Sequence, residues 1–114
     1  MTLTYCKKIG ESAFKNCRSI VSLAIPDLEI VPDFCFEGCS SLSALAMTEV
    51  KSIGRRAFYN TNINTISLIS VTEINAEAFA NCNELKYVYN LKQYSSSSGR
   101  WMLYDSNGNV QNEI

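Results

Sequence analysis

Four phenylalanines recur at a nearly constant spacing along the chain. They are Phe14, Phe36, Phe58 and Phe79. The spacing is roughly 22 residues, and self-similarity at a fixed period of this size is the sequence signature of a repeat architecture. Each phenylalanine lies in a stretch with the same order of apolar and small residues, from IGESAFKNCRSIVSLAIP at residues 9–26 to INAEAFANCNELKYVY at residues 74–89. Helix-pair repeats need about 33 residues or more, so each unit is predicted to form one coil of a solenoid.

Other apolar positions keep the same spacing. These columns are Ile9, Val31, Ile53 and Ile74; Ala13, Cys35, Ala57 and Ala78; Ile20, Leu42, Ile63 and Leu85; and Leu23, Leu45, Ile66 and Val88. Equivalent side chains are predicted to stack in a common interior. The composition agrees, because a chain of 114 residues that is 46% hydrophobic with a net charge of −1 is typical of a single ordinary domain.

Each coil is predicted to contain two kinds of local structure. Inward residues such as Leu23 and Ile25 alternate with outward ones, which predicts a short strand. Stacked coils would align these strands in parallel, roughly 4.8 Å apart. The segments 11–16, 33–38, 55–60 and 76–81 are predicted to form one turn of α- or 3₁₀-helix on the opposite side.

Two further local features are predicted. A minor extended segment is expected near Leu28, Val50 and Val71. Pro32 stands where Gly10 and Gly54 stand in neighbouring coils, and proline excludes a left-handed backbone. The turn is therefore predicted to differ between coils.

The combined frame, I-G-x-x-A-F-x-x-C-x-x-L-x-x-L-x-I-P-x-x-V-x-x-I, resembles the bacterial surface-antigen class of leucine-rich repeat (BspA-like, Treponema type) over about residues 1–90. Departures are local: Cys35 replaces the usual alanine, and Thr61 replaces the cysteine in a repeat one residue short. The resemblance implies an α/β solenoid, a right-handed coil of about four repeats, each of roughly 21–22 residues, which is within the range of leucine-rich repeats. It also implies adhesion to host proteins or other cells, and a cell-surface or extracellular location.

The two ends of the chain depart from the regular repeat. Residues 1–90 are assigned to the solenoid, whose first coil is incomplete, and we expect an exposed apolar N-terminal end that indicates a fragment or a missing partner. Residues 91–114 are assigned to a serine-rich loop and a hairpin around Asn107-Gly108, a dipeptide that suits a type I′ turn. The hairpin is expected to cap the C-terminal end. A mobile tail and a cell-wall-binding hairpin are the alternatives.

No catalytic, cofactor-binding or metal-binding residue is predicted. The chain has no histidine, which is the usual base for a nucleophile and the commonest zinc ligand. Cys35 and Cys39 lack the second ligand pair of a zinc site. Cys17 and Cys39 share a column, but parallel stacking would hold their Cβ atoms roughly 4.8 Å apart, beyond the reach of a disulfide. The five cysteines are therefore predicted to be free thiols.

The charge balance also excludes some partners. A net charge of −1 points to neither nucleic acid nor an anionic membrane. The chain contains no run of 18 or more apolar residues, so no segment is long and apolar enough to span a bilayer. Lys51, Arg55 and Arg56 form a small basic spot that is predicted to be merely solvated.

The outward positions of the strand ladder form the candidate binding surface for a protein ligand. They are Ser22, Ala24, Ala44, Ala46, Thr65, Ser67, Tyr87 and Tyr89. The tyrosines are expected to be anchors, since tyrosine is enriched at binding hot spots. The plainer interpretation is a close-packed strand surface without a ligand. Alternative functions are a spacer or self-assembling array that associates through the uncapped N-terminal end, and a carbohydrate-binding module using Trp101 and Tyr104 with the two tyrosines.

Overall fold

The computed structural model describes residues 1–85 and the backbone of residues 87–89, 102–104 and 110–113. These residues form nine short strands and no helix. The strands are β1 (Ser22–Ala24), β2 (Ile30–Val31), β3 (Ala44–Ala46), β4 (Ser52–Ile53), β5 (Thr65–Ser67), β6 (Glu73–Ile74), β7 (Tyr87–Tyr89), β8 (Met102–Tyr104) and β9 (Val110–Glu113).

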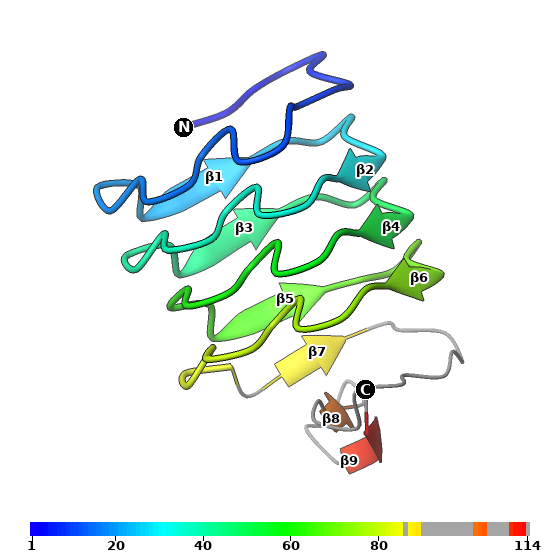
Figure 1. The fold of residues 1–114 in the computed structure, drawn as a ribbon. Helices are drawn as coiled ribbons and strands as arrows, with labels where there is room; N and C mark the ends of the chain where they lie inside the picture. Colours follow the sequence, from blue (N-terminus) through cyan, green and yellow to red (C-terminus); the bar gives the residue numbers. More distant parts are fainter. Residues whose placement is uncertain (86, 90–101, 105–109, 114) are drawn as a thin grey trace.

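Successive coils lie one above another, as predicted (Figure 1). On one side β1 pairs with β3 and β5 with β7, and on another side β2, β4 and β6 form a second sheet. Every one of these pairs is parallel and joins residues one period apart, such as Leu23 with Leu45 and Ile53 with Ile74. The second sheet begins two residues after the predicted minor segment. The repeat solenoid is therefore confirmed, with the apolar columns stacked inside it.

The side that carries the phenylalanines contains turns instead of the predicted helical turn. In the first coil, the N–H groups of Ala13, Lys15 and Cys17 donate to the carbonyls three residues earlier. The N–H groups that alternate with these, at Ser12, Phe14 and Asn16, donate to backbone carbonyls of the second coil at 2.7 to 3.2 Å. A helix would need all these donors for itself. The helical prediction is wrong because every second donor bonds the next coil.

This arrangement, which we call the turn stack (residues 10–17, 32–39, 54–61 and 75–82), has the same backbone in every coil. Two columns have positive φ: Ser12, Phe34, Arg56 and Glu77 at 51 to 60°, and Asn16, Gly38, Asn60 and Asn81 at 58 to 77°. Pro32 belongs to neither column. Its fixed φ is therefore compatible with the common turn, and the prediction of a different turn at this coil is wrong.

The phenylalanines form a continuous stack in the interior. Successive rings lie 5.2 to 5.3 Å apart between centroids with interplanar angles of 6 to 7°. Phe36, Phe58 and Phe79 are fully buried, whereas Phe14 is half-buried. Burial of each of the three fully buried rings contributes about 1.5 to 3 kcal/mol.

Several apolar side chains of the first coil are exposed or half-buried in this chain. Residues 1–5 lie on the first coil: Leu3 N–H donates to the Ala24 carbonyl at 2.8 Å, and Tyr5 N–H donates to the Asp27 carboxylate at 3.0 Å. They cover this coil only in part. We call the result the open N-terminal layer, formed by exposed Met1, Tyr5 and Val21 and by half-buried Leu3, Ile9, Phe14, Cys17 and Ile20.

The strand ladder is interrupted between β3 and β5, which form no β-pair. The third coil has one residue fewer between Thr61 and Ile63, just before β5. Here Asn62 N–H donates to the Leu42 carbonyl at 3.1 Å. The second sheet stays continuous through the same coils. The single ladder that the sequence predicts is therefore divided into two parallel pairs, β1 with β3 and β5 with β7.

Beyond the solenoid, β8 and β9 pair antiparallel with an irregularity at Leu103 and Tyr104. They flank the predicted Asn107-Gly108 turn, which lies outside the described residues together with the serine-rich loop. Its capping role stays a prediction. The described part of the chain contains no helix that could cross a membrane.

Candidate functional site

The strand face is the outward surface of β1, β3, β5 and β7. All eight predicted residues lie in these strands, with Ser22 opposite Ala44, Ala24 opposite Ala46, Thr65 opposite Tyr87 and Ser67 opposite Tyr89. Ser22, Ala44, Ala46 and Thr65 are exposed, whereas Ala24 and Ser67 are half-buried. Leu23 and Ile66 alternate with them and are 1% exposed. In β1, β3 and β5 this alternation places Ser22, Ala24, Ala44, Ala46, Thr65 and Ser67 outward, as the sequence predicts.

The described side chains of the strand face are small and uncharged. Thr65 Oγ1 donates a hydrogen bond to the side-chain oxygen of the neighbouring Asn64 at 2.9 Å. Methyl and hydroxyl groups close to the backbone allow a flat or extended polypeptide to approach, and they offer no acid, base or metal ligand. The side chains of Tyr87, Tyr89 and Tyr104, and all of Trp101, lie outside the described residues. Their binding roles stay predictions.

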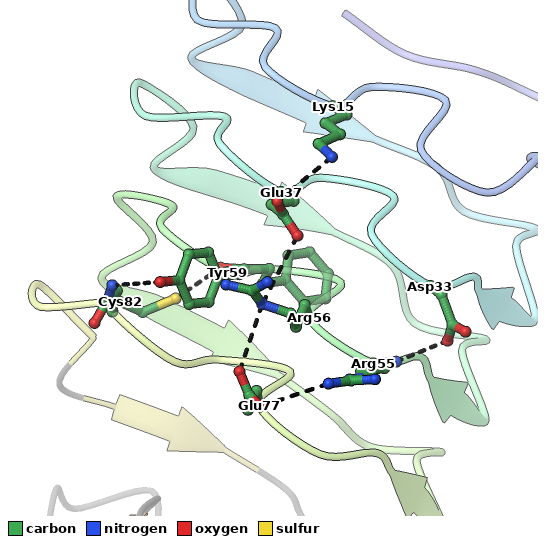
Figure 2. Close-up of polar contacts among 10 residues, drawn as sticks. Lys15, Asp33, Glu37, Arg55, Arg56, Tyr59, Glu77 and Cys82 are labelled. Atoms are coloured by element: carbon green, nitrogen blue, oxygen red, sulfur yellow. Dashed lines mark hydrogen bonds and ion pairs between the residues drawn. The ribbon is translucent and has the colours of Figure 1, made fainter.

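Charged side chains gather on the turn stack instead. Lys15, Glu37, Arg56 and Glu77 alternate in sign from one coil to the next, and we call them the charge row (Figure 2). Lys15 Nζ lies 3.6 Å from Glu37 Oε1, and Arg56 Nε lies 3.9 Å from Glu37 Oε2 and 3.5 Å from Glu77 Oε2. The row bridges all four coils.

Arg56 is the most enclosed cation of this row. Its guanidinium carbon lies 3.8 Å from the centroid of the Tyr59 ring, and the Tyr59 hydroxyl accepts a hydrogen bond from Asn81 at 2.9 Å. Arg56 Nε and Glu37 Oε2 are buried without a hydrogen bond among the described residues. Their mutual attraction and the cation–π contact offset part of the cost of desolvation.

The predicted basic spot is compensated by acids. Lys51 Nζ lies 3.1 Å from Glu29 Oε1, and Arg55 NH2 lies 3.9 Å from Glu77 Oε1. Arg56 belongs to the charge row. These pairs leave little excess positive charge for a ligand, which favours a structural role.

The five cysteines are free thiols. Cys39 Sγ–H donates to the Phe14 carbonyl and Cys82 Sγ–H to the Phe58 carbonyl, both at 2.9 Å. Burial, reinforced by the nearby Cys39 thiol, raises the pKa of the Cys35 thiol to about 12. Burial also raises the pKa of Cys39 to about 11 and raises the pKa of Cys82. Buried thiols with raised pKa values are poor nucleophiles.

The described residues contain no group of three or more cysteines or carboxylates placed to hold a metal ion. A groove of ≈ 450 Å³ lies beside the turns that follow β1 and β3, and its lining includes Lys7, Asp27, Glu29 and Glu49. Glu29 is held by Lys51, and Asp27 by the Tyr5 N–H. The described side chains of the strand face thus carry no charge, in contrast to those of the turn stack and of this groove.

A sequence-family comparison agrees with this geometry. Residues 5–109 match the family model described as "BspA type Leucine rich repeat region (6 copies)". The chain belongs to the BspA-type leucine-rich repeat family. No curated protein matches this BspA-type chain.

Solved structures support the same family. A leucine rich cell surface protein from Faecalibacterium prausnitzii A2-165 is 27% identical with a TM-score of 0.69, and the match covers 87% of this chain and 27% of that one. A leucine-rich repeat protein from Bacteroides ovatus ATCC 8483 is 28% identical with a TM-score of 0.55, covering 70% of this chain and 28% of that one. A leucine-rich repeat protein of T. pallidum, at 21% identity and a TM-score of 0.56, shares the fold. The match covers 73% of this chain and 51% of that one. This BspA-type chain therefore spans little more than a quarter of the first two.

The acids of the charge row are residues that the sequence pattern did not single out. Glu37 and Glu77 were not recognised as partners of Lys15 and Arg56. A signal was present, since Lys15 and Glu37 lie one period apart in the sequence, and so do Arg56 and Glu77. Opposite charges one period apart in a stacked repeat should be treated as neighbours.

Proposed function

We propose that this chain is a noncatalytic protein-interaction module whose partner contacts the strand face. The observation that carries the proposal is a row of small, uncharged, outward side chains on consecutive coils, whereas Lys15, Glu37, Arg56 and Glu77 of the turn stack are paired with one another. Repetition makes such a row an extended surface, which is how solenoid proteins bind. Membership of the BspA-type family, together with similarity to a solved cell surface protein, supports adhesion and a surface or extracellular location.

The decisive variant is Ala44→Arg, in the exposed part of β3. A long cation would hold the partner away from the strands, so capture of a partner from a host-cell or extracellular-matrix extract should fall at least tenfold. Ile30→Arg is the matched control, because Ile30 is 60% exposed on the second sheet. It should leave capture unchanged.

Equal capture by the wild-type chain and Ala44→Arg would overturn the strand-face proposal. Loss of capture in Ile30→Arg alone would indicate that the partner contacts the second sheet instead. Circular dichroism and urea titration of each variant separate loss of binding from loss of folding.

We also propose self-association through the open N-terminal layer. Met1 is 60% exposed, Tyr5 84% and Val21 56%. The carbonyls of Glu11, Ala13 and Lys15 accept no hydrogen bond from the described residues, whereas their equivalents one coil later all do. Acceptors cannot pair with acceptors, so two such layers facing each other would be held by apolar contacts. Such a dimer should be weak and strengthened by sulfate, which favours apolar burial.

Light scattering against protein concentration tests this second proposal. The apparent mass should rise with concentration, and Val21→Lys should hold the chain at the monomer mass. Ile69→Lys, at a residue 40% exposed elsewhere, is the control and should associate normally. A wild-type chain that stays monomeric at millimolar concentration in sulfate would exclude self-association.

A further inference from the structure

No further inference is drawn: the strongest candidate, the groove of ≈ 450 Å³ beside the turns that follow β1 and β3, is an acidic cluster of Asp27, Glu29 and Glu49 with Lys7 at which nothing in the structure points to a ligand.

Discussion

At the scale of single residues, position in the stack decides what a side chain contributes. Phe58 has a ring on either side at 5.3 and 5.2 Å and is fully buried. Phe14 has the same local sequence but a single stacked neighbour, and it is half-buried at the open N-terminal layer. Identical residues in equivalent positions should therefore differ in their effect on stability.

Phe58→Ala should lower the free energy of unfolding by roughly 3 to 5 kcal/mol, because it leaves a cavity between two rings. Phe14→Ala should cost less than half as much, because the removed ring is already partly in water. Urea denaturation followed by circular dichroism measures both. Equal losses would mean that the first layer is closed in solution.

The buried cysteine of the second coil makes stability depend on pH. The pKa of Cys35 is raised from 9.0 to about 12, so the folded chain holds this proton more tightly than the unfolded chain. The contribution of the protonated Cys35 thiol to the free energy of unfolding is fully present below pH 9. It is lost as the pH rises from about 9 towards 12. Stability should therefore fall on the alkaline side.

Cys35→Ala tests this dependence with little disturbance, since Ala57 and Ala78 occupy the same column. Between pH 8 and pH 11 the free energy of unfolding should fall more steeply in the wild-type chain than in the variant. Every other titratable group is the same in both proteins, so the difference between the two slopes reports Cys35. Identical slopes would show that Cys35 is not shielded from water.

At the scale of elements, backbone bonds between coils replace helical bonds within a coil. Alternate N–H groups of the turn stack serve the local turn and the next coil. This alternation needs a left-handed residue twice in each coil. Asparagine and glycine adopt that conformation at low cost, whereas Phe34, Arg56 and Glu77 adopt it because the surrounding coils hold them there.

Two glycines of the turn stack provide a matched test. Gly38 has φ of 77°, and a Cβ there would clash with the Asn16 side chain, so Gly38→Ala should cost at least about 1 to 2 kcal/mol. At Gly10 the backbone is not left-handed and nothing lies within 4 Å of an added Cβ. Gly10→Ala should be neutral or stabilise by roughly 0.4 to 1 kcal/mol. Thermal unfolding compares the two, and the opposite order would contradict the assigned backbone.

At the scale of the whole molecule, the size of the strand face limits its affinity. Three-residue strands extend roughly 10 Å, and four coils at roughly 4.8 Å spacing extend a further ~20 Å, giving a footprint of ~200 Å². A standard interface takes about 800 Å² from each partner. A partner that contacted this face alone would be held weakly.

The proposed interaction should therefore depend on valency. A single copy of the chain should bind its partner with a Kd in the micromolar range or weaker. Four copies on one streptavidin should bind a surface coated with the partner about 100-fold more tightly or better, through effective concentration. Surface plasmon resonance measures both forms. Nanomolar binding by a single copy would indicate a contact area well beyond the strand face.

The sequence by itself determined the features that depend on spacing. The period of the repeat predicted the solenoid, the stacked phenylalanines and the strand registers, because side chains one period apart must be neighbours in a stack. It also placed Ser22, Ala44 and Thr65 on one face, since alternation along a strand is local.

Only the tertiary structure decided where each backbone donor finds its acceptor. Nothing local to Phe34 or Arg56 predicts a left-handed backbone, and the turns there exist because every second N–H group bonds a carbonyl of the next coil. The gap between β3 and β5 and the approach of Arg56 to Glu37 have the same origin. Each depends on which coil lies above or below, and that is settled only when the coils stack.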